Sequence, residues 1–229
     1  MNIYTWIFTG LLVVDVVLYI LSLIKGINPL EKVARSLLIP LVAGIILSIL
    51  TGYLPDSHHI IFIATLAYGT ACLFMLTTLK KNRFFKFAEH FLFLLTNIFW
   101  LLLISSVYRI YKVSLLLFIL TGIVFIAGFV ATCVFIKKQP LYKYAAAIIQ
   151  YFFTAVLSVT AFVCLLYEKR AFAVLIFTAS LVIMCHVIFE TFQRTRPFAI
   201  NEKTERIFTT ILSVTAQALI GVGAILMQI

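Results

Sequence analysis

The stretch YAAAIIQYFFTAVLSVTAFVCLLY at residues 144–167, followed by EKR at 168–170 and AFAVLIFTASLVIMCHVIF at 171–189, decides the fold. Neither apolar run contains a charged residue. Because a helix rises about 1.5 Å per residue, about 20 residues cross a hydrocarbon core roughly 30 Å thick. A membrane strand would be about half as long and would alternate apolar with polar side chains, which these runs do not. The stretch therefore predicts two membrane-spanning helices joined by a short charged turn.

Runs of the same kind fill the rest of the chain. Of its 229 residues, 64% are hydrophobic and 11% are charged, whereas soluble domains are about half apolar and a quarter charged. We therefore predict an all-α fold, a polytopic transmembrane helix bundle of about eight helices that forms a single integral membrane domain over residues 1–229. The expected helices lie at approximately 3–24, 34–54, 57–79, 85–107, 113–136, 142–167, 171–192 and 205–228.

The basic residues are distributed as topology signals. The net charge is +10, and 14 of the 18 lysines and arginines lie in the loops after the first, third, fifth and seventh predicted spans. Because loops rich in Lys and Arg stay in the cytoplasm, both termini should lie outside it. We expect an integral protein of a bacterial inner membrane. Because the basic residues lie beside the spans, the expected partner is membrane lipid and not nucleic acid. The oligomeric state is left open.

Six polar residues lie deep inside the apolar runs. Counted at about 1.5 Å per residue from the nearest cytoplasmic basic residue, their depth is about 10 to 16 Å, and they are Asp15, Thr70, Asn97, Gln150, His186 and Gln217. A polar side chain that faces lipid is costly, so these residues should face the bundle interior and line a cavity open toward the cytoplasmic leaflet. The alternative is that the amides join helices by hydrogen bonds and that Thr70 bonds to its own helix.

Motifs for metals or cofactors are missing from the sequence. The four cysteines, Cys72, Cys133, Cys164 and Cys185, lie in apolar runs without zinc-site spacing. Paired-histidine, phosphate-loop and dinucleotide-binding patterns do not occur either. We therefore expect no metal and no cofactor.

Several stretches resemble the YhhN family of lysoplasmalogenase-like membrane proteins. ARSLLIPL at 34–41 is similar to the family's T-K-P-L-L-M-P-L, with Arg35 at the lysine position and Pro40 at the second proline. YGTACLFML at 68–76 and FLFLLTNIFW at 91–100 resemble G-D-x-x-L and F-x-x-x-H-x-x-Y, with Thr70 at the aspartate and Asn97 at the histidine.

The same resemblance extends to the last helices. LVIMCHVIFETFQRTRPF at 181–198 is similar to L-F-x-x-S-D-x-x-L-A, with His186 at the aspartate. TAQALI at 215–220 keeps the family's glutamine at Gln217, and PLYKYAAAIIQ at 140–150 resembles the entry to the sixth helix. The resemblance implies about eight helices and cleavage of the vinyl-ether bond of lysoplasmalogens, which releases an aldehyde. Both motif aspartates are replaced here, and of their replacements only His186 can act as an acid near neutral pH.

Three functions follow as hypotheses. In a lysoplasmalogenase-type hydrolase acting on a lysophospholipid, the catalytic candidates are His186, Asp15 and Thr70, and the substrate-binding candidates are Arg35, Asn97, Gln150 and Gln217. Arg35 would bind the substrate phosphate, a contact suited to a guanidinium. The alternatives are a non-catalytic protein that binds a lipid or amphiphile, and a small transporter with Asp15 as the coupling carboxylate.

Overall fold

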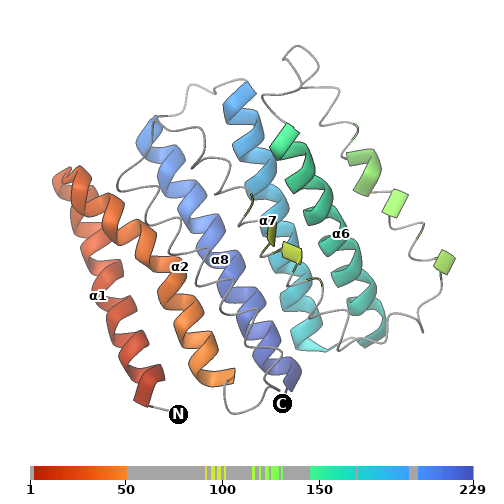
Figure 1. The fold of residues 1–229 in the computed structure, drawn as a ribbon, viewed down its shortest axis with the longest axis horizontal. Coiled ribbons are helices and arrows are strands. Elements are labelled where there is room, and N and C mark those ends of the chain that lie inside the picture. Colours follow the sequence, from red (N-terminus) through yellow and green to blue (C-terminus); the bar gives the residue numbers. More distant parts are fainter. Residues whose placement is uncertain are drawn as a thin grey trace. The chain divides into compact units, whose positions relative to one another are not determined.

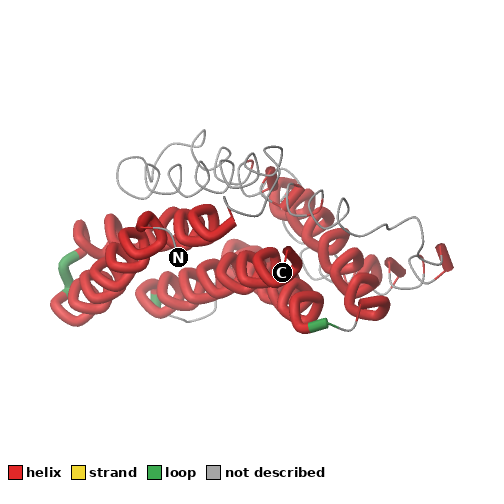
Figure 2. Tube along the Cα trace, turned by 90° about the horizontal axis from the view of Figure 1, so that it is seen from below, coloured by secondary structure: helices red, strands yellow, loops and turns green. Residues whose placement is uncertain are grey.

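The computed structural model describes residues 3–50, 145–168, 170–195 and 201–228, together with scattered positions between 91 and 130. In this part of the chain every regular element is a helix and no strand occurs (Figure 2). The predicted all-α class is thus confirmed. The predicted span 57–79 lies outside the described residues, and only scattered positions, in runs of up to four residues, are described in 85–107 and 113–136.

Four helices in the described part are long and apolar enough to cross a membrane, and they make the chain an integral membrane protein. The candidate spans are Ile3–Lys25, Ile148–Glu168, Ala171–Phe189 and Lys203–Leu226. The chain forms two compact units, one of Met1–Thr96 with Ala224–Ile229 and the other of Asn97–Gly223.

The first unit contains the helices α1 (Ile3–Lys25) and α2 (Asn28–Leu50), which lie side by side (Figure 1). A glycine cap ends α1: Gly26 has φ 67°, and the Ile27 N–H donates to the Ser22 carbonyl over 3.0 Å. Pro29 then lies in the first turn of α2, where a missing N–H costs nothing. The helix therefore begins at Asn28, earlier than the predicted start at 34.

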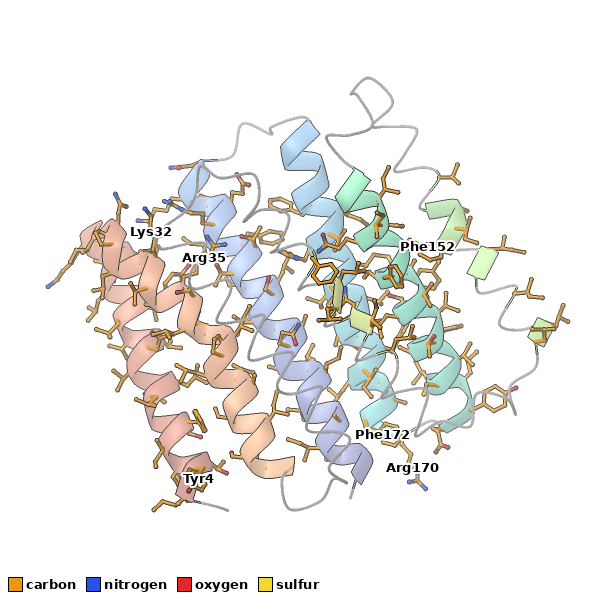
Figure 3. The ribbon with its side chains drawn as sticks, viewed as in Figure 1. Tyr4, Lys32, Arg35, Phe152, Arg170 and Phe172 are labelled. Atoms are coloured by element: carbon orange, nitrogen blue, oxygen red, sulfur yellow. The ribbon has the colours of Figure 1, made fainter. Side chains whose placement is uncertain are left out.

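The early start of α2 places its charged residues inside the helix. Glu31, Lys32 and Arg35 lie in its first two turns. Figure 3 shows Lys32 and Arg35 at the end of the hairpin that carries the turn, with Tyr4 at the opposite end. Their long side chains can extend toward the membrane surface while the helix axis continues into the hydrocarbon region.

The α1–α2 hairpin is held by close contacts near its open end. The Thr5 and Ser48 hydroxyl oxygens lie 2.8 Å apart. A β-carbon added at Gly44 would lie only 2.7 Å from Cδ1 of Phe8, so the glycine lets the ring approach the α2 backbone. The rest of α1 exposes large apolar side chains, among them Trp6 and Leu11, as a lipid-facing surface requires.

The second unit contains α6 (Ala145–Glu168), α7 (Ala171–Thr195) and α8 (Glu202–Gln228) as far as Gly223. The helices α6 and α7 form an antiparallel hairpin in which the rings of Phe162 and Phe177 lie 5.2 Å apart. Figure 3 shows Arg170 and Phe172 together at its turn. Fully buried small residues let the helix backbones approach closely, and they include Ala161, Ala173, Ala179 and Ser180.

The helix α8 runs antiparallel to α7 and contacts it near both ends. Asn201 caps α8 through its Oδ1, which accepts a hydrogen bond from the Lys203 N–H over 3.1 Å. The rings of Phe189 and Phe208 lie 4.8 Å apart at this end. Toward the other end a β-carbon added at Gly223 would lie 2.7 Å from Cγ1 of Ile176. These contacts fix the register of the two helices along their length.

Candidate functional site

A buried histidine joins α7 to α8. Nε2 of His186 lies 3.3 Å from Oγ of Ser213, and His186 is 9% exposed. The Ser213 hydroxyl donates its proton to the Thr209 carbonyl over 2.9 Å. A hydroxyl has one proton to donate, so Ser213 accepts from the imidazole. We therefore assign a hydrogen to Nε2 of His186, which leaves Nδ1 as the nitrogen that can take up and release a second proton.

Gln217 lies one helical turn beyond Ser213 on the same face of α8. It is 3% exposed, and its Oε1 is buried without a hydrogen-bond partner among the described residues. A buried acceptor left without a donor costs about 1–3 kcal/mol. A water molecule or a ligand hydroxyl at this position would supply the missing donor.

The helix α6 contributes a polar face of its own. Gln150, Thr154 and Ser158 follow one another at intervals of four residues and are all buried. Thr154 donates to the Gln150 carbonyl over 2.8 Å, and Ser158 donates to the Thr154 carbonyl over 3.0 Å. These hydroxyls are thus satisfied within their own helix.

Asn97 adds a side chain from outside the three long helices. It is 1% exposed, and its Nδ2 donates to Oγ1 of Thr154 over 3.3 Å. Its Oδ1 is buried and has no hydrogen-bond partner in the described part of the chain. Among the described residues of the unit, the amide oxygens of Asn97 and Gln217 are thus both buried without a donor.

Helix register places Thr154, His186 and Ser213 at one level, whereas Gln150 and Gln217 each lie one helical turn from that level, on opposite sides of it. Phe162 faces Phe177, and equal steps away from a facing pair stay level in antiparallel helices. Eight residues before Phe162 is Thr154, and eight residues after Phe177 is Cys185, the neighbour of His186. We call this set the polar layer, and it comprises Asn97, Gln150, Thr154, His186, Ser213 and Gln217.

The structure places the predicted site residues in both units. Asn97, Gln150, His186 and Gln217 belong to the polar layer of the second unit. In the first unit, Asp15 is buried on α1 and Arg35 is partly exposed on α2. Thr70 lies outside the described residues. The predicted cavity and the predicted roles of these side chains stay predictions.

Thr154 and Ser213 were missed from the sequence. Both lie four residues from a predicted glutamine, Thr154 after Gln150 and Ser213 before Gln217. That spacing puts them on the same helix faces, and it is the signal that could have found them.

The described residues contain no group of three or more His, Cys, Asp or Glu side chains that could hold a metal ion. Cys164 and Cys185 are free thiols. The groups that the polar layer offers for chemistry are an imidazole, hydroxyls and amides. Together they can transfer a proton and orient a water molecule.

No protein-family model, curated protein or solved structure matches this chain.

Proposed function

We propose that this chain is a membrane-embedded hydrolase of the lysoplasmalogenase type, which cleaves the vinyl-ether bond of a lysophospholipid. The observation that carries the proposal is the partly buried hydrogen bond between the buried His186 and Ser213 in the polar layer. An imidazole titrates near neutral pH, so it can supply the proton that this reaction needs first. The buried amide oxygens of Asn97 and Gln217 supply acceptors for a water molecule.

The reaction begins when His186, as imidazolium, transfers the proton on Nδ1 to the alkene carbon remote from the ether oxygen. Nε2–H stays on Oγ of Ser213, which holds the ring in place. The substrate becomes an oxocarbenium ion. A water molecule adds to the carbon bonded to oxygen and returns a proton to Nδ1. The resulting hemiacetal then separates into an aldehyde and a glycerophospho-alcohol.

The amides act on the water molecule. If Oε1 of Gln217 or Oδ1 of Asn97 accepts a hydrogen from it, its lone pair is directed away from that amide and toward the substrate. Gln150 stands one turn from Thr154 and is proposed to bind substrate. The roles predicted for Arg35 at the substrate phosphate, for Thr70 beside the water and for Asp15 as an alternative acid belong to the same proposal.

Family and topology are also part of the proposal. We take the chain to be a diverged YhhN-like protein with eight spans in a bacterial inner membrane and both termini outside the cytoplasm. The four apolar helices of the described part and the bias of the basic residues support it.

Aldehyde release tests the proposal. The purified protein in detergent should release free aldehyde from a lysoplasmalogen, and His186→Ala should lower the rate by at least about a hundredfold. Thr178→Ala is the matched control, because Thr178 lies on the same helix but is exposed. It should keep the wild-type rate. No aldehyde from the folded wild-type protein would refute the hydrolase.

A non-catalytic amphiphile-binding protein is the second candidate. The observation that favours it is that the polar layer, as described, has no carboxylate, although the family motifs carry two aspartates. In that case a labelled lysophospholipid should bind to the protein without aldehyde release. Gln217→Leu should then weaken binding by about fivefold or more, because an amide that hydrogen-bonds the ligand is lost.

A further inference from the structure

One helix face in the first unit carries buried polar groups that lie outside the polar layer. We call this face the seam. Its residues follow one another along α1 at alternating steps of three and four, and they are Thr5, Phe8, Leu12, Asp15, Tyr19 and Ser22. The contacts of Thr5 with Ser48 and of Phe8 with Gly44 place the seam against α2. Asp15 and Tyr19, one turn apart, therefore point toward α2 as well.

Both side chains are buried with unpaired oxygens. Asp15 is 5% exposed and Tyr19 is 8% exposed. Oδ2 of Asp15 and the hydroxyl of Tyr19 have no hydrogen-bond partner among the described residues. Asp15 lies ten residues before Lys25, which is about 15 Å along the helix. An ionised carboxylate at that depth is costly unless a donor or a positive charge accompanies it.

The side chains of α2 at this level are apolar except for Ser36, whose buried hydroxyl donates to the Val33 carbonyl over 2.7 Å. Asp15 lies seven residues after Phe8, and Leu37 lies seven residues before Gly44, which faces Phe8. Asp15 is therefore level with Leu37 and with its buried neighbour Leu38. Pro40 has no N–H, so the Ser36 carbonyl lacks its usual helical donor. The proton of the Ser36 hydroxyl is used within α2, so this stretch adds a backbone oxygen but no side-chain donor for Asp15.

The charged groups of the hairpin other than Asp15 lie toward its turn. They are Lys25 on α1 and Glu31, Lys32 and Arg35 on α2. Arg35 lies two residues before Leu37, so it is the cation of the hairpin nearest to Asp15 along the helix axis. If its guanidinium paired with Asp15, the carboxylate would be ionised and compensated, and the experiment below would detect that state.

We propose that Asp15 and Tyr19 form a site for one monovalent cation, H⁺ or Na⁺, in the α1–α2 hairpin. A single positive charge neutralises the carboxylate, and the oxygens of Asp15, Tyr19 and the Ser36 carbonyl are the hard ligands that such a cation prefers. The site uses no residue of the polar layer, so it can be present whether or not the protein hydrolyses lipid.

Dicyclohexylcarbodiimide tests the site, because this apolar reagent modifies protonated carboxyl groups in apolar surroundings. The full-length protein in detergent is treated without Na⁺, and the adduct is located by mass spectrometry. We expect the modification at Asp15, which is one of eight acidic residues in the chain. Raising the pH should slow it if the bound cation is H⁺. Adding Na⁺ at constant pH should slow it if Na⁺ competes.

Variants sharpen the test. Asp15→Asn should lose the adduct, and Glu31→Gln, which alters another buried carboxyl of the hairpin, should keep it. Tyr19→Phe removes one ligand, so the cation concentration that half-fills the site should rise about tenfold. Circular dichroism and gel filtration check that each variant is folded.

Infrared spectroscopy provides a second measurement that does not depend on the reagent. The band of a protonated carboxyl group should be present in the wild-type protein without Na⁺ and reduced in Asp15→Asn. Two results would overturn the site. One is the absence of both the adduct and this band, which would mean that Asp15 is ionised and compensated within the protein. The other is a modification rate indifferent to both pH and Na⁺.

Discussion

At the scale of single residues, the partner of His186 is the most informative position to change. Ser213→Ala removes the acceptor for Nε2–H and should slow aldehyde release about tenfold or more, the effect of one hydrogen bond to a charged group. Ser213→Thr keeps a hydroxyl and should restore most of the rate. The measurement is kcat/KM for the two variants side by side. A wild-type rate in Ser213→Ala would remove the pair from the mechanism.

Arg35 should affect binding more than chemistry. Its guanidinium can hold a phosphate through two parallel hydrogen bonds, which are made equally in the ground state and the transition state. Arg35→Ala should therefore raise KM about tenfold or more and change kcat less. Arg35→Lys keeps the charge but not the paired geometry, so its KM should be intermediate. A lower kcat at unchanged KM would contradict the phosphate role.

The sequence revealed amides and the imidazole of the site but not its hydroxyls. Gln150, His186 and Gln217 stood out because such groups are costly in lipid. Ser213 and Thr154 did not, because a hydroxyl in an apolar helix can bond to its own backbone and then carries no signal. The pairing of His186 with Ser213, 27 residues apart, depends on the register of two helices, which no local pattern specifies.

At the scale of elements, charge-free runs predicted the positions of α1, α6, α7 and α8 to within a few residues. They misplaced the start of α2, because charges were taken to end a span. The features that define this start are the cap at Gly26 and the proline at position 29. Charged side chains can extend to the membrane surface from within a helix, so backbone signals mark its beginning better than charge does.

Helix packing at Gly223 should be sensitive to one added carbon. A β-carbon there would lie 2.7 Å from Cγ1 of Ile176 and 3.3 Å from the Phe172 carbonyl oxygen. Gly223→Ala should therefore destabilise the protein by about 1–3 kcal/mol, because α8 must move away from α7. Thermal unfolding in detergent measures this. Gly10→Ala is the control, since nothing lies within 4 Å of its added carbon, and an equal effect of both changes would contradict the packing argument.

At the scale of the whole molecule, sequence order explains part of the architecture. The pairs α1–α2 and α6–α7 are neighbours in the chain joined by short turns, which favour antiparallel hairpins. The division into two compact units had no counterpart in the sequence. The composition of the apolar runs does not reveal which of them pack together, because the runs are similar in composition. The choice of neighbour depends on the shapes of small and large side chains at each interface.

The arrangement of the chain across the membrane is open to direct measurement. The basic residues predict that 80–86 and 194–206 lie in the cytoplasm and that the turn at Lys169 and Arg170 lies outside with both termini. Alkaline phosphatase, which is active only outside the cytoplasm, should therefore be active when fused after residue 170 or at the C-terminus, and inactive when fused after residue 203. The α6–α7 turn and the α7–α8 connection lie at opposite ends of α7, so these fusions must give opposite results whatever the orientation. Equal phosphatase activity of the fusions after residues 170 and 203 would contradict the assignment of α7 as a membrane span. An inactive C-terminal fusion with an active fusion after 203 would reverse the proposed orientation.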